Sequence, residues 1–201
     1  MEADRAQLLG ASQLGEETPP VNVRAFFGLP LPEAQRQTLD TYLRDCAARA
    51  PEFRWAPAAN LHLTVRFLGH VDASLAEGVA DRLAEAELQS FELRLGETGT
   101  FKRGRLARVV WLGLTSGAEE IAALAAKVEA ECERAGLERE ARRFNAHLTL
   151  ARARARDGAP LPELGPAPEL DAWQADELIL YRSHLGRAGS VYEPISRIRL
   201  S

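Results

Sequence analysis

The tripeptide His-Leu-Thr occurs twice in this chain of 201 residues, at residues 62–64 and again at residues 147–149. The chain has only four histidines, so half of them lie in one short pattern. Each copy belongs to an apolar, β-branched run that predicts a β-strand. Because side chains alternate along a strand, each histidine shares a face with the threonine two residues later, and the leucine between them points into a core. The duplication therefore predicts two strands that each present one imidazole and one hydroxyl.

The residue types in this pattern suit acid–base chemistry on a phosphate. If the two strands face each other, His62 and His147 bracket a site that also holds the hydroxyls of Thr64 and Thr149. One neutral imidazole can accept a proton from an attacking water while the other, as imidazolium, donates a proton to a leaving alkoxide. The threonine hydroxyls can donate to the non-bridging phosphate oxygens. We therefore predict cleavage of a phosphodiester by paired histidines.

An arginine follows each copy of the motif and could neutralise charge on the phosphate. Arg66 is four residues after His62 and shares its face if the strand is regular. Arg152 is five residues after His147 and points away from it in a regular strand. Only a bulge or a twist would bring Arg152 to the site.

Other chemistries fit the sequence less well. Two histidines supply two ligands, whereas a catalytic zinc usually has three from the protein, and neither motif carries an Asp or Glu at a matching position. The chain contains no Gly-x-Ser-x-Gly nucleophile elbow and no Gly-x-x-x-x-Gly-Lys-Ser/Thr phosphate loop. We therefore expect no metal and no cofactor.

Composition and charge narrow the partners and the compartment. The net charge of −4 argues against a general polyanion binder, so any RNA contact must come from a local basic patch. No run approaches the length of a membrane span, so we expect no membrane partner. Cys46 and Cys132 lie on apolar stripes of predicted helices and indicate buried free thiols in a reducing compartment, with a disulfide as the alternative. We therefore expect a cytoplasmic protein, with a disordered extension at residues 1–20 that carries no secretory signal and one domain at residues 21–201.

The order of predicted elements favours an α+β protein. Capping-box patterns at Ser74 and Ser116 predict two helix starts, and another helix follows Pro32. The Gly- and charge-rich segment 96–105 predicts a loop. The strand pairs on both sides of this loop and at the C-terminal end resemble hairpins, which favours antiparallel sheets. Strands are expected at residues 22–29, 60–69, 91–95, 106–114, 144–151, 173–181 and 191–200. Both motif strands follow a helix, which is a weak sign of internal duplication.

These segments resemble the two-histidine phosphoesterase superfamily and, within it, the RNA 2′,3′-cyclic phosphodiesterases once named 2′-5′ RNA ligases. The resemblance covers roughly residues 23–200 and is carried by segments 24–27, 60–69, 144–152 and 180–183. It implies a bilobal fold in which two pseudo-symmetric lobes present antiparallel sheets to a central cleft, with helices outside. It also implies metal-independent hydrolysis of a terminal 2′,3′-cyclic phosphate on RNA to a 2′-phosphomonoester.

The same resemblance implies roles for single residues. His62 would be the proton donor to the leaving 3′ oxygen and His147 the proton acceptor, while Thr64 and Thr149 would hold the phosphate. Arg152 matches the arginine that follows the family's second motif. RNA 3′ ends or small cyclic-phosphate nucleotides are the expected partners of a monomer. Two alternatives remain open, which are 2′-5′ ligation of RNA ends as the reverse reaction and a catalytically idle nucleotide- or RNA-binding module.

Overall fold

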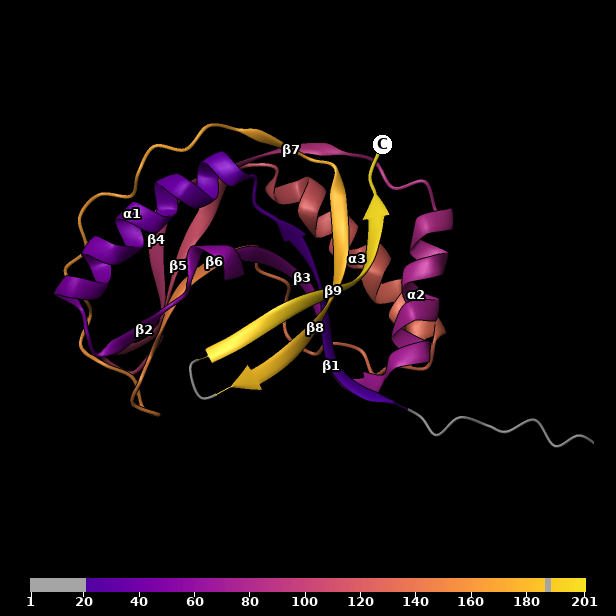
Figure 1. The fold of residues 1–201 in the computed structure, drawn as a ribbon, viewed down its shortest axis with the longest axis horizontal. Coiled ribbons are helices and arrows are strands. Elements are labelled where there is room, and N and C mark those ends of the chain that lie inside the picture. Colours follow the sequence, from indigo (N-terminus) through magenta and orange to yellow (C-terminus); the bar gives the residue numbers. More distant parts are fainter. Residues whose placement is uncertain (1–20, 187–188) are drawn as a thin grey trace, which may run out of the picture.

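A computed structural model describes residues 21–186 and 189–201, so the predicted extension at residues 1–20 lies outside the described residues. The described chain is an α+β protein with antiparallel strands, as predicted, and the strands join into one large sheet (Figure 1). Its helices are α1 (Glu33–Arg49), α2 (Ala73–Glu85), α3 (Ala118–Arg134) and the 3₁₀ helix η1 (Ala58–Asn60). Its strands are β1 (Asn22–Pro30), β2 (Phe53–Trp55), β3 (His62–Asp72), β4 (Phe91–Arg103), β5 (Leu106–Ser116), β6 (Leu148–Ala153), β7 (Trp173–Ala175), β8 (Glu177–Gly186) and β9 (Gly189–Arg199).

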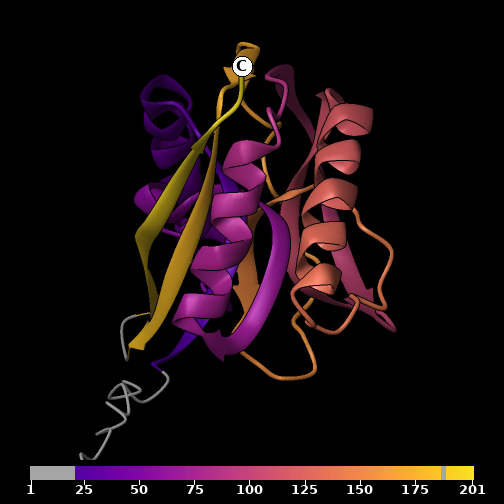
Figure 2. The ribbon, with the colours of Figure 1, turned by 90° about the vertical axis from the view of Figure 1, so that its right-hand side faces the viewer.

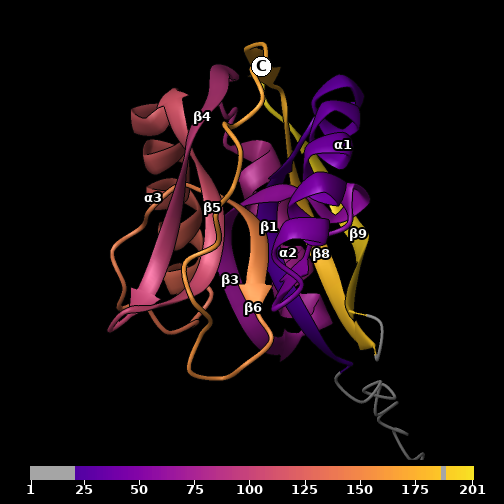
Figure 3. The same cartoon turned by 90° about the vertical axis from the view of Figure 1, so that its left-hand side faces the viewer.

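The strand order divides the molecule into two lobes. The order is β7-β4-β5-β6-β3-β1-β8-β9, and β2 pairs with β6; Figure 3 shows most of this row from the side. At the centre, β3 and β6 pair only through Leu63 and Leu148, both of which are fully buried. The strands β3, β1, β8 and β9 therefore form one lobe, and β6, β5, β4, β7 and β2 form the other.

The two lobes repeat one connection. In the first lobe the neighbouring strands β1 and β3 are joined through α1, and in the second the neighbours β5 and β6 are joined through α3. Each helix crosses between the lobes, because α1 contacts η1 and β2 whereas α3 contacts β3. This shared topology supports the internal duplication that the two motifs suggested.

Helices α2 and α3 lie side by side against the sheet (Figure 2). The stripe of α2 that faces the core is fully buried, from Ala76 to Leu83. The helix starts two residues earlier than the capping box predicted, because the Asp72 side chain accepts hydrogen bonds from the backbone N–H groups of Ser74 and Leu75. Cys46 and Cys132 are buried and free, as predicted. Within the described ranges, no helix has the length and apolarity needed to cross a membrane.

The predicted loop at residues 96–105 is wrong, because β4 continues as a strand to Arg103. Two of its glycines, Gly96 and Gly99, serve packing, whereas Gly104 lies in the turn that joins β4 to β5 and has a φ of 59°. A Cβ on Gly99 would lie 2.2 Å from the ring of Trp111, and a Cβ on Gly96 would lie 2.2 Å from Thr115. Glycine in a strand interior marks such a close approach, which sequence analysis cannot distinguish from a loop.

Candidate active site

The two His-Leu-Thr motifs meet where the lobes join. Leu63 and Leu148 are antiparallel partners, so one step along each strand His62 lies beside Thr149, and Thr64 lies beside His147. The four polar side chains therefore share one face of the sheet, called the site face below. His62 is the first residue of β3, but His147 directly precedes β6 rather than lying within a strand as predicted.

Both imidazoles are held in the same way. Nδ1 of His62 lies 2.8 Å from the carbonyl oxygen of Asn60, and Nδ1 of His147 lies 2.7 Å from that of Asn145. Because a carbonyl oxygen only accepts, Nδ1 carries the proton in each ring, and Nε2 of the neutral ring is the free base. Nε2 of His62 lies 3.0 Å from Oγ1 of Thr64, which donates to it in the neutral state.

The pKa values of both histidines are lowered. Burial is the largest cause for each, because it disfavours the charged ring. The positive charge of Arg152 lowers both further, and His147 adds to the effect on His62, whose pKa falls to about 4. Arg152 is thus close enough to act on both rings.

A bulge in β6 brings Arg152 to the site face. Trp111 of β5 pairs with Thr149, and the residue before it, Val110, pairs with Ala151. Leu150 therefore has no partner and is an extra residue in β6. The alternation shifts by one after Leu150, and Arg152 returns to the face of Thr149. The bulge that the sequence geometry required is therefore present.

A matching bulge in β3 removes Arg66 from the site face. Phe27 pairs with Arg66 while Gly28 pairs with Thr64, which leaves Val65 unpaired in the ladder. The predicted placement of Arg66 on the His62 face is wrong, because this extra residue reverses the alternation. The Arg66 side chain is 9% exposed and is directed toward α3, where its Nε lies 2.5 Å from the Glu129 carboxylate as an ion pair without hydrogen-bond alignment.

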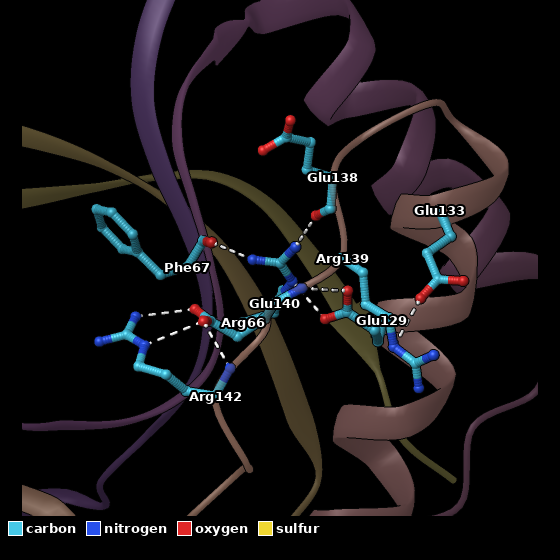
Figure 4. Close-up of polar contacts among 8 residues, drawn as sticks. All are labelled: Arg66, Phe67, Glu129, Glu133, Glu138, Arg139, Glu140 and Arg142. Carbon is cyan, nitrogen blue, oxygen red and sulfur yellow. Dashed lines mark hydrogen bonds and ion pairs between the residues drawn. The ribbon is translucent and has the colours of Figure 1, made fainter.

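The Arg66 guanidinium also binds backbone on both sides of the lobe boundary (Figure 4). Nη1 donates to the carbonyl of Phe67 at 2.6 Å, and Nη2 donates to the carbonyl of Glu138 at 2.5 Å. Glu129 in turn accepts a hydrogen bond from the backbone N–H of Glu140 at 3.0 Å. Arg66 therefore anchors the irregular segment between α3 and His147 rather than facing the site.

Aromatic rings surround each imidazole. The ring centroid of Phe26 lies 4.6 Å from that of His62, and the Tyr192 ring stands nearly perpendicular to His62 at a centroid distance of 5.0 Å. On the other lobe, Phe101 meets His147 edge-on at 4.9 Å. Phe27 is fully buried in the core, so only Phe26 of these two adjacent phenylalanines reaches the site face. These rings add to the burial that lowers the histidine pKa values.

Sequence reasoning missed several of these residues although a signal existed for some. An asparagine stands two residues before each histidine, so the repeated pattern is Asn-x-His-Leu-Thr rather than His-Leu-Thr. No such signal marked Tyr192, which reaches His62 from a distant strand, β9. Gly28 was also missed: a Cβ there would lie 3.3 Å from the His62 ring, so a small residue lets the imidazole lie on β1.

Comparisons with a protein-family model and with similar proteins agree with each other. The LigT-like phosphoesterase family matches residues 29–111 and, a second time, residues 112–192, so each match holds one copy of the motif. Two of the similar proteins are both named RNA 2′,3′-cyclic phosphodiesterase. That of Aeropyrum pernix is 31% identical over 70% of this chain and 82% of its own length. That of Escherichia coli is 29% identical over 89% of this chain and 97% of its own.

Solved structures of similar fold agree. Escherichia coli LigT complexed with 3′-AMP superposes with a TM-score of 0.76 at 27% identity, covering 90% of this chain and 99% of LigT. The protein TT0787 of Thermus thermophilus superposes with a TM-score of 0.72 at 28% identity, covering 88% of this chain and 97% of TT0787. The same Escherichia coli protein has also been crystallised with phosphate and with ATP.

Proposed function

This chain belongs to the LigT-like phosphoesterase family, and from that premise we propose that it hydrolyses the 2′,3′-cyclic phosphate at the 3′ end of RNA to a 2′-phosphomonoester. One observation carries the proposal: the Leu63–Leu148 pairing sets both imidazoles and both threonines on one face. In each ring Nδ1 is tied to a backbone carbonyl, which leaves Nε2 as the atom that exchanges protons.

The proposed reaction is a single displacement at phosphorus. Nε2 of His147 accepts a proton from water as the water oxygen attacks phosphorus, and the bond from phosphorus to the 3′ oxygen breaks. Nε2–H of His62 donates its proton to that leaving oxygen. Thr64 and Thr149 donate to the non-bridging oxygens, and Arg152 offsets their negative charge.

The proton donor must be charged, although the pKa of His62 is about 4 in the free protein. A bound cyclic phosphate places a negative charge next to both rings, where it opposes the effect of Arg152 and raises both pKa values. Substrate binding thereby favours one protonated ring, and the proposed mechanism assigns that proton to His62, next to the leaving oxygen. This coupling explains how a buried histidine can serve as an acid.

The test is turnover of a short RNA that ends in a 2′,3′-cyclic phosphate, measured in EDTA. We expect the wild type to open the ring to a 2′-phosphate, and we expect His62→Ala and His147→Ala each to lose roughly a hundredfold or more in rate. Loss of activity in EDTA would contradict the metal-independent mechanism. Full activity in either variant would contradict the acid–base pair.

The same assay separates the alternatives. Formation of a 2′-5′ bond between RNA ends would reveal the reverse reaction. We expect hydrolysis to dominate in water, because nothing in the chain supplies the energy for ligation. A wild type that binds a nucleoside 2′-phosphate without turning over the cyclic phosphate would be an idle binding module. We further infer a cytoplasmic monomer: one chain supplies both motifs, and both thiols are free and buried. Sedimentation of the purified protein checks the monomer.

A further inference from the structure

Arg24 of β1 lies on the site face but has no part in the proposed reaction. Along β1, Arg24, Phe26 and Gly28 alternate on one face, and Phe26 and Gly28 both adjoin the His62 ring. The residues between them, Ala25 and Phe27, are fully buried in the core. Arg24 therefore lies two residues, or roughly 7 Å, along the strand from a ring that contacts His62.

The guanidinium of Arg24 is held in place, and no carboxylate of the described residues neutralises it. Its central carbon lies 4.5 Å above the ring of Phe67, and Nη1 donates to Oγ of the buried Ser183 at 2.9 Å. Across residues 21–186 and 189–201, no carboxylate forms an ion pair with Arg24. An arginine has five N–H donors, so most of them remain for a ligand.

The pseudo-symmetry of the lobes places this cation at the end of the site opposite Arg152. Phe67 follows His62 by five residues and Arg152 follows His147 by five, and in both strands a bulge lies in between. Thr64 lies beside His147. Phe67 is three residues farther along β3, beyond His147, and Arg24 lies over its ring. At equivalent positions, the second lobe therefore has Arg152 itself, whereas the first lobe has Phe67 with the Arg24 guanidinium stacked on its ring.

We propose that Arg24 forms a second phosphate subsite, which binds the phosphate on the 5′ side of the terminal nucleotide. The inference rests on the proposed function, because it takes the cyclic phosphate to lie between the two histidines. A guanidinium binds phosphate oxygens through paired N–H donors, and stacking on Phe67 orders its plane before the ligand arrives. Arg24 would then make an RNA end a better substrate than a mononucleotide.

The experiment compares three substrates: one without a phosphate on the 5′ side, one with a 5′-phosphate, and one in which that phosphate links a second nucleoside. They are adenosine 2′,3′-cyclic phosphate, the same nucleotide with a 5′-phosphate, and the dinucleotide ApA ending in a 2′,3′-cyclic phosphate. We expect the wild type to favour the second and third substrates in kcat/KM. In Arg24→Met, which keeps a long side chain over Phe67, we expect the ratio of either to the first to fall roughly tenfold or more. Arg24→Lys should keep part of the preference, because it retains charge without the planar pair of donors.

Arg182→Met is the matched control. Arg182 pairs with Ala25 on the neighbouring strand β8, and its charge acts on Glu193, so it carries the same charge close by on the other face. We expect its substrate ratios to match those of the wild type, and we expect the ratios of the wild type to decline as KCl is raised.

Several outcomes would overturn the subsite. Ratios near one in the wild type, or ratios that Arg24→Met leaves unchanged, would exclude it. A gain with the dinucleotide but not with the 5′-phosphate would assign the preference to a sugar or base instead. If the wild type opened none of the three substrates, the proposed function would fail separately. Dissociation constants of the matching 2′-phosphates, with and without a 5′-phosphate, would then decide the role of Arg24 by the same ratio.

Discussion

At the scale of single residues, the protonation of the two histidines decides the chemistry. Burial and Arg152 lower both pKa values below the ordinary 6.5, and that of His62 to about 4. Near neutral pH both rings of the free protein are therefore neutral and carry their proton on Nδ1, where the carbonyls of Asn60 and Asn145 accept it. Nitrogen-15 NMR of labelled protein should show this tautomer and two titrations below pH 6.5.

Removing the Arg152 charge should raise both pKa values, because a nearby cation disfavours the imidazolium. We expect Arg152→Met to move both NMR titrations to higher pH and to lower kcat/KM through weaker phosphate binding. Arg154→Met is the control: Arg154 donates to the backbone carbonyl of Pro51, and Arg154 is not among the charges that act on either ring. A wild-type His62 that titrates at 6.5 or above would show that its ring is better solvated than the structure implies.

At the scale of elements, the Arg66–Glu129 pair joins β3 to α3 and to the segment that leads to His147. Both side chains are largely buried, and removing one partner of such a pair leaves the other charge uncompensated. We expect Arg66→Met to lower the free energy of unfolding by about 3–5 kcal/mol in urea denaturation. We also expect it to reduce kcat, since the Glu138 carbonyl loses its donor and Glu129, which holds the backbone of Glu140, loses its ion-pair partner.

Arg82→Met supplies the comparison. Arg82 also pairs with a glutamate of α3, Glu131, but its side chain is 42% exposed and its pair lies 3.2 Å apart. An exposed pair of this kind contributes about 0–1 kcal/mol. Equal losses of stability in Arg66→Met and Arg82→Met would mean that the Arg66 contacts are solvated and do not anchor the segment.

At the scale of the whole molecule, the two lobes share one narrow connection through the sheet. Leu63 and Leu148 are fully buried there and separate the two halves of the site by one strand spacing. We expect Leu63→Ala and Leu148→Ala each to cost about 2–5 kcal/mol in the free energy of unfolding, because each leaves a cavity. Leu161→Ala, at a side chain that is 54% exposed, should change stability by less than about 0.5 kcal/mol.

Because α1 and α3 each cross to the other lobe, we also expect the lobes to unfold together. Tryptophan fluorescence and far-ultraviolet circular dichroism should report one coincident transition for the wild type. Two separated transitions in the wild type would mean that each lobe is stable alone and that the crossing helices do not couple them.

The sequence by itself determined the features that depend on local alternation and local chemistry. The His-Leu-Thr repeat predicted which atoms could react, which leucines are buried and that the fold is α+β, because side chains alternate along a strand whatever its neighbours are. The structure agrees with this prediction at Leu63 and Leu148, which are the residues that pair at the centre.

Only the tertiary structure decided which arginine reaches the site. The sequence favoured Arg66 over Arg152, and the two bulges reversed that order, since an unpaired residue at Val65 or Leu150 changes the face of everything after it. A bulge forms between two strands, so it depends on a partner that lies far away in sequence. The same reason hid Arg24, whose stacking on Phe67 and bond to Ser183 require three strands to lie side by side.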